Sequence, residues 1–178
     1  HLDVLSSRFG QASVLGGVCL IAATLDASRA IVQMTNMHSI VFGELDGTRS
    51  ARVDAIGAAL RTGGFDVEAI DAIAQQMWEK WVFLATLAGS TCLFRASVGD
   101  ILAAPGGQLA MRTLFDECAA VAAAHGHAMR EPFAERSRAM LFAQGSPLTA
   151  SMLRDIENGL RTEGDHVLGD LLARRPAH

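Results

Sequence analysis

The hydrophobic positions follow two different periods along the chain, and the change lies near residue 47. Before it, short apolar runs rich in β-branched residues occupy 14–24, 30–36 and 39–44. They predict two or three strands after a short first helix, Leu2–Phe9. Three strands alone are not a stable unit, so the pattern predicts either more sheet upstream or a small meander packed on helices.

From Ser50 onward, apolar residues recur at helical spacing almost throughout. Glycine and proline divide this region, and the segment 99–107 is predicted to be a loop because it contains Pro105-Gly106-Gly107. Asp66 is predicted to cap a helical segment that leads into the apolar run beginning at Trp81. The predicted helices span about 50–62, 66–95, 109–125, 132–143 and 149–173.

The composition excludes several classes of protein. Half of the 178 residues are hydrophobic and 19% are charged, which excludes disorder and allows a sizeable core. A net charge of −4 argues against a nucleic-acid surface or a basic membrane-binding face. The most apolar run, Trp81–Phe94, is too short to span a bilayer. Three cysteines without metal-type spacing fit a reducing cytoplasm. The first residue is His1 rather than methionine, so we expect a piece of a longer protein.

Lys80 is the most informative single residue. It opens a stretch of fourteen residues that carries no charge. A lysine at the edge of so apolar a surface is partly desolvated, which lowers its pKa and suits it to donate a proton near neutral pH. The alternative interpretation is that its stem lies on Trp78 or Trp81 while the ammonium group reaches water.

A second cluster lies near the C-terminus. A single helix here would place Ser151 and Asp155 one turn apart and Glu163 about 120° around from Ser151. A hydroxyl at a helix start, beside free backbone amides, suits the binding of a carboxylate. The alternative is that Ser151 only caps the helix, while Asp155 and Glu163 form a solvated face with Arg154 and Arg161.

Two other motifs are weak. Gly16-Gly17 precedes an apolar strand, but no Gly-x-Gly-x-x-Gly leads into a helix anywhere in the chain, so a complete dinucleotide site is missing. His125-Gly126-His127 has no third ligand at a suitable spacing, and the end of a helix explains it more simply. We therefore expect no metal site.

Several blocks of residues together resemble the 2-dehydropantoate 2-reductase (ketopantoate reductase) family over essentially the whole chain. Neither the Trp-x-Lys block nor the Ser-Met-x-x-Asp…Thr-Glu block is specific alone, but together they are. The blocks are Gly16-Gly17-Val18 with Ala22-Ala23, Ile40-Val41-Phe42-Gly43-Glu44, Met77-Trp78-Glu79-Lys80, Ser151-Met152-Leu153-Arg154-Asp155 and Thr162-Glu163-Gly164-Asp165.

The resemblance implies a mostly α fold. Residues 1–47 would be the last strands of a Rossmann-type α/β domain that binds the dinucleotide. Residues 48–178 would be an all-helical C-terminal domain of the 6-phosphogluconate-dehydrogenase-like type, which binds substrate and forms a homodimer. The Gly-x-Gly-x-x-Gly loop of the family would lie upstream, outside this chain, so the chain alone is expected to be inactive and to bind NADPH weakly.

The resemblance also implies a reaction and roles for four residues. NADPH would deliver hydride to the ketone of a 2-oxo acid, ketopantoate or a related compound, in pantothenate biosynthesis in the cytoplasm. Lys80 matches the general acid, and Ser151 matches the residue that holds the substrate. Glu163 matches a residue near the cofactor, and Ala23 falls on a backbone contact to it.

The sequence departs from the family at two positions. The family usually has asparagines four and eight residues after its lysine, where this chain has Leu84 and Ala88. The departure implies a substrate with a more apolar tail than ketopantoate. An alternative is a helical interaction module that has kept the fold and lost catalysis. A dehydrogenase of the β-hydroxyacid type also has a catalytic lysine, but the Ser-Met-x-x-Asp block argues against it.

Overall fold

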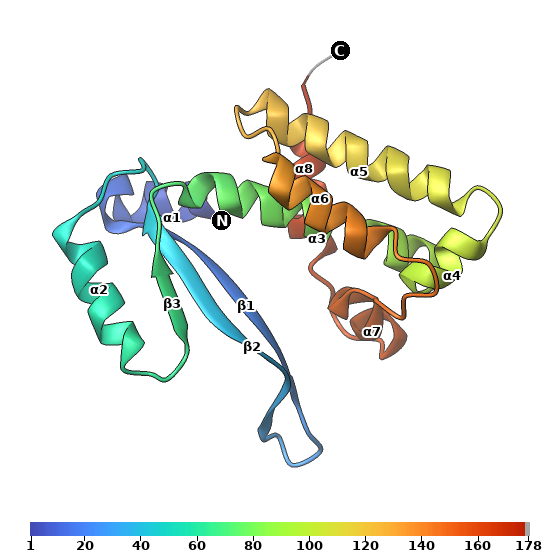
Figure 1. The fold of residues 1–178 in the computed structure, drawn as a ribbon, viewed down its shortest axis with the longest axis horizontal. Coiled ribbons are helices and arrows are strands. Elements are labelled where there is room, and N and C mark those ends of the chain that lie inside the picture. Colours follow the sequence, from blue (N-terminus) through green and yellow to red (C-terminus); the bar gives the residue numbers. More distant parts are fainter. Residues whose placement is uncertain (177–178) are drawn as a thin grey trace. The chain divides into compact units, whose positions relative to one another are not determined.

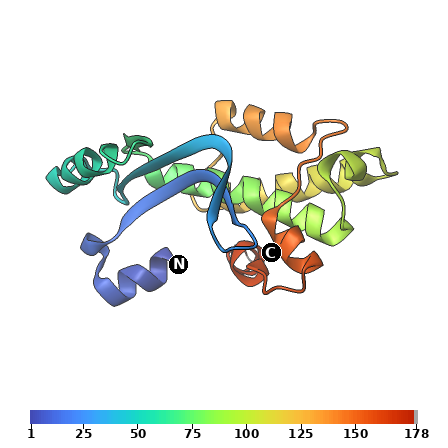
Figure 2. The same cartoon turned by 90° about the horizontal axis from the view of Figure 1, so that it is seen from below.

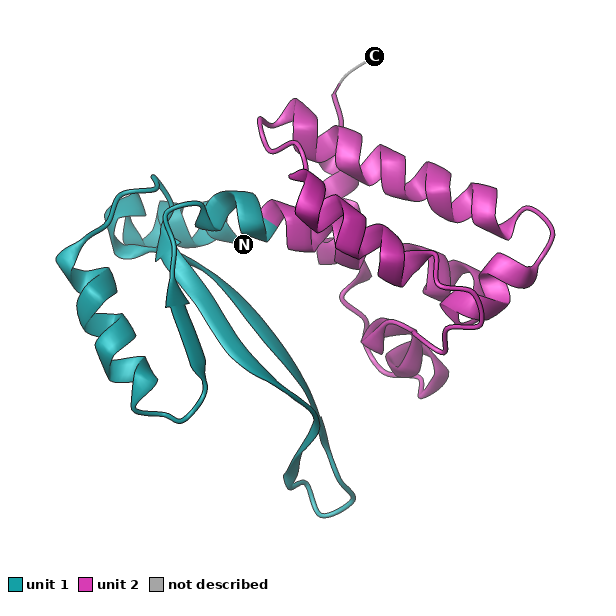
Figure 3. Ribbon diagram, viewed as in Figure 1, with its two compact units in different colours: residues 1–77 teal, residues 78–178 magenta. Residues whose placement is uncertain are grey.

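The computed structural model describes residues 1–176, which fall into two compact units, each taken here by itself (Figure 3). The first unit ends at Met77 and the second begins at Trp78. The boundary expected near residue 47 is therefore displaced. A third strand at Asp66–Ala69 pairs with the sheet, and Ile73 and Met77 pack on it, so these residues join the first unit.

The first unit is a three-stranded sheet with two helices. It contains α1 (Leu2–Phe9), a short 3-10 turn, β1 (Leu15–Leu25), β2 (Ile31–Glu44), α2 (Ala51–Arg61) and β3 (Asp66–Ala69). The strand order is β1-β2-β3, with β1 antiparallel and β3 parallel to β2. β3 pairs only with Ser39–Phe42, so the far part of the β1–β2 hairpin continues past it as a two-stranded ribbon (Figures 1 and 2).

The sequence predicted most of this unit, with two errors. The helix Leu2–Phe9 and the first strand lie where they were expected. The separate strands predicted at 30–36 and 39–44 are one continuous strand, β2. Asp66 caps no helix and instead begins β3, because pairing with β2 satisfies the backbone of this segment. The pairing with β2 therefore outweighed the local preference of this segment for a helix.

Glycine lets the start of α3 (Ile73–Phe94) approach the sheet of the first unit closely. Gly16 and Gly43 are paired across β1 and β2. A Cβ on Gly16 would lie 2.9 Å from Ile73 Cγ2, and a Cβ on Gly43 would lie 2.1 Å from the carbonyl oxygen of Ile70. Ile73 is fully buried against Val18 and Val41. Gly16 therefore serves helix–sheet packing.

A buried carboxylate joins the end of β2 to the start of α2. Glu44 is 8% exposed and accepts hydrogen bonds from the Ser50 hydroxyl and, at 2.7 Å, from Arg52 Nε. Ser50 is also the N-cap of α2, where its hydroxyl accepts from the Val53 amide. The hydrogen bonds from Arg52 and Ser50 lower the pKa of Glu44 to about 2.

We expect the first unit to lose stability as the pH falls from about 4.5 towards 2, and Glu44→Gln to remove part of this dependence. The pKa of Glu44 is about 2 when folded and returns to 4.5 on unfolding. Its contribution is therefore complete above pH 4.5 and is lost as the carboxylate is protonated below it. Urea unfolding followed by circular dichroism at several pH values measures the difference. Hydrogen bonds also lower the pKa of Asp26 and Asp46, and these hydrogen bonds are present in both proteins. Identical pH dependence in the two would contradict the prediction.

The second unit is helical and contains the larger core. It begins within α3 and continues with α4 (Val98–Ala103), α5 (Gly107–Ala124), α6 (Glu131–Leu141), α7 (Ser151–Glu157), a π-helical turn η2 (Asp165–Gly169) and α8 (Asp170–Ala173). Val82, Met111 and Leu141 are fully buried in its core. Among the helices of residues 1–176, none has both the length and the apolar character that crossing a bilayer requires.

Two expectations for this unit are wrong. The predicted loop at 99–107 contains most of α4, whose N-cap is Ser97. The Ser97 hydroxyl accepts from the Asp100 amide. The predicted helix 149–173 is interrupted, because α7 ends at Glu157 and Gly159 has a φ of 67°, which no helix interior allows. The mostly helical fold class itself is confirmed.

Candidate functional site

Lys80 lies on α3, near the start of the second unit, and is half-buried. It is the only lysine in the sequence. Leu84, one turn further along the same face, is 38% exposed, whereas Ala88 after another turn is 5% exposed. The surface that continues from Lys80 along the helix is therefore apolar and offers no amide at these positions.

The residue before Lys80 carries a buried charge that sequence reasoning missed. Glu79 is fully buried and accepts three hydrogen bonds from Arg130: from the backbone amide at 2.9 Å, from Nε at 2.9 Å and from the terminal nitrogen at 2.6 Å. Arg130 is the N-cap of α6. The pair raises the pKa of Arg130, chiefly through the hydrogen bonds to Glu79. The signal in the sequence that could have indicated a buried Glu79 was its place just before the uncharged residues 81–94.

Trp78 and Trp81 flank Glu79 and Lys80 on α3. The Trp78 ring stacks on His125 and His127 at centroid distances of 5.2 and 5.5 Å. Trp81 donates from Nε1 to the Val167 carbonyl oxygen at 2.8 Å. Burial, followed by repulsion from His125, lowers the pKa of His127. The His125-Gly126-His127 segment thus packs on an indole ring, and within residues 1–176 no three His, Cys, Asp or Glu side chains gather in a way that could hold a metal ion.

Ser151 is the first residue of α7, and it does not cap that helix. The N-cap is Ala150, which lacks a capping side chain. The Ser151 side chain is exposed and hydrogen-bonds to no residue of the described chain, so its hydroxyl is available to a ligand. The Ala150 amide donates to Thr91 Oγ1 at 3.3 Å, which ties the start of α7 to α3.

Glu163 lies in the irregular segment before η2, not on one helix with Ser151. Its carbonyl oxygen accepts from the amides of His166 and Val167, and Val167 in turn accepts from Trp81, next to Lys80. The next residue, Gly164, lies near Met152 of α7, with its Cβ position 4.0 Å from the sulfur. Glu163 is therefore attached both to the turn of α3 that carries Lys80 and to α7.

The charged residues near Ser151 are largely exposed to water and form no ion pairs with one another in the described residues. Neither Asp155 nor Glu163 forms a salt bridge with Arg154 or Arg161 in residues 1–176, and Arg154, Arg161 and Glu163 are exposed. Of the four residues singled out from the sequence, Lys80, Ser151 and Glu163 thus belong to α3 or to segments hydrogen-bonded to it.

Ala23 belongs to the first unit. It lies in the outer part of β1 and pairs with Gln33 of β2, just after an irregularity in the register between Ile21 and Ala23. Its side chain is exposed. A register break of this kind turns the backbone locally and is common beside binding sites.

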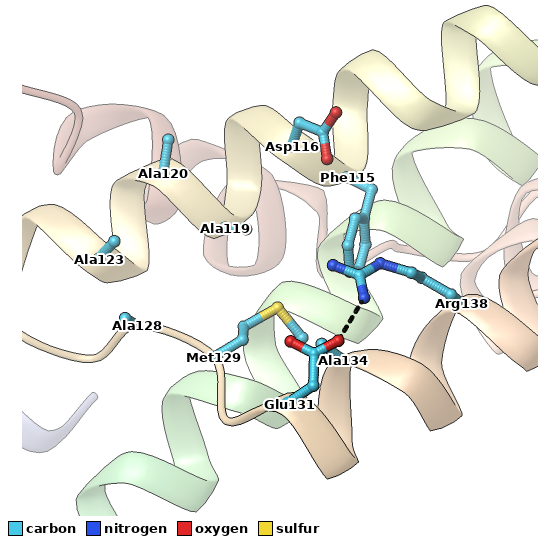
Figure 4. A pocket seen from close by; sticks show the side chains of 10 residues that line it. All are labelled: Phe115, Asp116, Ala119, Ala120, Ala123, Ala128, Met129, Glu131, Ala134 and Arg138. Atoms are coloured by element: carbon cyan, nitrogen blue, oxygen red, sulfur yellow. Dashed lines mark hydrogen bonds and ion pairs between the residues drawn. The ribbon is translucent and has the colours of Figure 1, made fainter.

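A hollow of about 310 Å³ lies between α5 and α6 (Figure 4). Phe115, Ala119 and Met129 contribute its apolar lining, and Arg138 pairs there with Glu131 at 3.0 Å. Lys80, Ser151 and Glu163 do not line it. The hollow is therefore separate from the residues that the sequence predicts to be functional.

Comparison with known proteins gives consistent results. The family model described as "Ketopantoate reductase PanE/ApbA C terminal" matches residues 72–175. "Uncharacterized oxidoreductase YkpB" of Bacillus subtilis is 34% identical over 174 residues, which are 98% of this chain and 57% of that protein. The crystal structure of 2-dehydropantoate 2-reductase from Methylococcus capsulatus is similar with 27% identity and a TM-score of 0.76, over 97% of this chain and 54% of that one.

A more distant structure shares the fold alone. The complex of D-mandelate dehydrogenase with NADH is 18% identical with a TM-score of 0.82, over 98% of this chain and 59% of that one. In each comparison the chain spans a little over half the length of the protein it matches.

Proposed function

The chain belongs to the ketopantoate reductase PanE/ApbA C-terminal family, and we propose that it is the C-terminal part of an enzyme that reduces a 2-oxo acid to the 2-hydroxy acid with a nicotinamide cofactor. The observation that carries the proposal is the arrangement around α3. Its only lysine is half-buried, and the segments bearing an unbonded serine and an exposed glutamate are hydrogen-bonded to the same helix.

Lys80 would be the general acid. Reduction of a ketone places negative charge on its oxygen, and an ammonium group beside that oxygen stabilises the charge and then donates a proton to it. Partial burial strengthens the interaction, because less water competes for the charge. The Ser151 hydroxyl would hold the substrate carboxylate by donating a hydrogen bond.

The cofactor would be NADPH, which supplies the hydride when bound. Glu163 fits a place beside it, because its exposed carboxylate has no salt-bridge partner in residues 1–176 and can accept hydrogen bonds from ribose or amide groups. Ala23 would contribute a backbone contact near the register break of β1. No glycine-rich phosphate loop occurs in the sequence, so the phosphates would bind to the part of the protein outside this chain.

Steady-state assays of the full-length protein test this function. We expect NADPH oxidation that depends on a 2-oxo acid, with a higher kcat/KM for NADPH than for NADH. A panel of ketopantoate, 2-oxoisovalerate, 4-methyl-2-oxopentanoate and benzoylformate covers hydroxylated, aliphatic and aromatic side chains. Absence of turnover with every member would contradict the proposed function.

Ser151→Ala is expected to raise KM about tenfold or more with a smaller change in kcat. Loss of one hydrogen bond to a charged group costs about 1.5–3 kcal/mol, and a contact to the carboxylate is the same in the ground state and the transition state. Initial-rate kinetics measure the effect, and Ser146→Ala, in the loop before α7, is a control. An unchanged KM would exclude Ser151 from substrate binding.

The preferred substrate would have an apolar side chain because Leu84 stands on the Lys80 face. We expect Leu84→Asn to raise the kcat/KM ratio for ketopantoate over 4-methyl-2-oxopentanoate by about tenfold or more, since a hydroxyl gains a partner and an apolar tail loses one. Competition assays with both substrates measure the ratio. Leu93→Asn, on an exposed part of the same helix, is the matched control, and an equal response of both variants would contradict a role for Leu84.

The helical unit would also form a homodimer in the cytoplasm. Large apolar side chains are exposed on several of its elements, among them Leu109 at 70% and Leu172 at 62%. Contacts between two copies would remove such side chains from water. The chain alone would lack catalysis and bind NADPH weakly. Sedimentation of the isolated chain would measure dimerisation, and calorimetry would measure NADPH binding.

A further inference from the structure

We propose that Glu79 and Arg130 form a positioning pair that fixes the orientation of Lys80 for proton donation; this rests on the function proposed above. Glu79 has no exposed surface, so it acts on the reaction through the turn of α3 that it shares with Lys80.

Three hydrogen bonds join the two residues of the pair. All three donors that reach the Glu79 carboxylate from Arg130 lie at 2.6–2.9 Å, and they join α3 to a residue 51 positions later. A buried ion pair generally adds little net stability compared with well-packed apolar residues. It does fix direction, because a two-point contact from a planar guanidinium allows only one relative orientation.

The contacts of Trp78 and Trp81 complete the attachment. Glu79 connects to the start of α6, Trp78 to the rings of His125 and His127 after α5, and Trp81 to the carbonyl oxygen of Val167 in η2. Successive residues of a helix point about 100° apart, so these contacts leave α3 in different directions. The turn that bears Lys80 therefore resists both rotation and sliding.

Such fixation affects the transition state more than substrate binding. A general acid must meet the developing alkoxide at hydrogen-bond distance, and a displacement of about 1 Å can cost as much as a hundredfold in rate. Substrate affinity depends instead on Ser151. Glu79 is consequently expected to influence kcat and leave KM nearly unchanged.

Kinetics of Glu79→Gln in the full-length protein test the proposal. Glutamine keeps the size of the side chain and loses the charge. We expect kcat to fall about tenfold or more, with KM within twofold of the wild-type value. The control is Glu131→Gln, which breaks the exposed Arg138–Glu131 pair on α6 and should leave both constants unchanged. Should Glu79→Gln fail to fold, Arg130→Lys keeps the charge but not the two-point contact and is expected to lower kcat in the same way.

A second readout does not require activity. In the full-length protein, reductive methylation with ¹³C-formaldehyde labels the lysine side chains, and the Lys80 signal is the one that is missing from Lys80→Arg. In Glu79→Gln the charge of Arg130 loses its carboxylate partner, so the pKa of the Lys80 amine should be lower than in the wild-type protein. An unchanged titration and an unchanged kcat, with only a lower melting temperature, would overturn the proposal. If the wild-type protein reduces no 2-oxo acid, the proposed function fails, and the titration alone supports or overturns the influence of the pair on Lys80.

Discussion

Replacing Lys80 with alanine is expected to lower kcat of the full-length protein at least a hundredfold. A positioned general acid contributes roughly 10²–10⁴-fold to a rate. Lys80 is half-buried beside the exposed part of Leu84, so a water molecule that replaced it would be a poorer acid in a less polar setting. Stopped-flow measurement of NADPH oxidation separates this step from product release.

Two controls show whether a loss of activity in Lys80→Ala is due to the loss of the proton donor. Lys80→Arg keeps the positive charge, but a guanidinium group stays protonated far above neutral pH and hardly donates a proton, so we expect a loss close to that of alanine. Near wild-type activity in Lys80→Arg would show that charge alone is needed. Tryptophan fluorescence checks the fold, since Trp78 and Trp81 flank the site. Unchanged turnover in Lys80→Ala would favour instead a helical interaction module that has lost catalysis.

The second large effect is expected from Gly43→Ala, which should destabilise the first unit by about 2–4 kcal/mol. The new Cβ would lie 2.1 Å from the carbonyl oxygen of Ile70, and no rotamer change relieves a collision with backbone. The neighbouring hydrogen bond from the Ile70 amide to the Phe42 carbonyl oxygen, at 2.9 Å, would have to lengthen as the segment between β3 and α3 moves away. Amide hydrogen exchange along β2, read by mass spectrometry, measures the loss in this unit specifically.

Gly17→Ala is the matched control for Gly43→Ala. Both glycines lie in adjacent strands of one sheet, but a Cβ on Gly17 would meet only the Val41 carbonyl oxygen at 3.9 Å, an ordinary contact. Alanine also restricts the unfolded chain, so we expect this variant to be as stable as the wild type or slightly more stable. Equal destabilisation of the two variants would mean that the close approach of α3 to the sheet is not the cause.

Local patterns in the sequence determined most of the helices and the candidate lysine. The periodic apolar residues of α5 and α6 predicted both helices, because a helix that buries one face shows that face in the order of its residues. The fourteen uncharged residues that follow Lys80 identified it in the same way, because such a stretch is visible in the order of the residues. Ser151 and Glu163 were singled out as a cluster near the C-terminus, and the resemblance to a family gave them their roles.

Only the tertiary structure decided the features that depend on distant partners. β3 exists because Asp66–Ala69 pairs with β2, although its own residues suggested a capped helix. The role of Gly43 depends on how closely α3 approaches the sheet, and Glu79 becomes a buried, two-point partner only through Arg130, 51 residues later. The separation of Ser151 from Glu163 by a break at Gly159 follows from a backbone angle. Periodicity records which face of a segment is buried, but it does not record what that face meets.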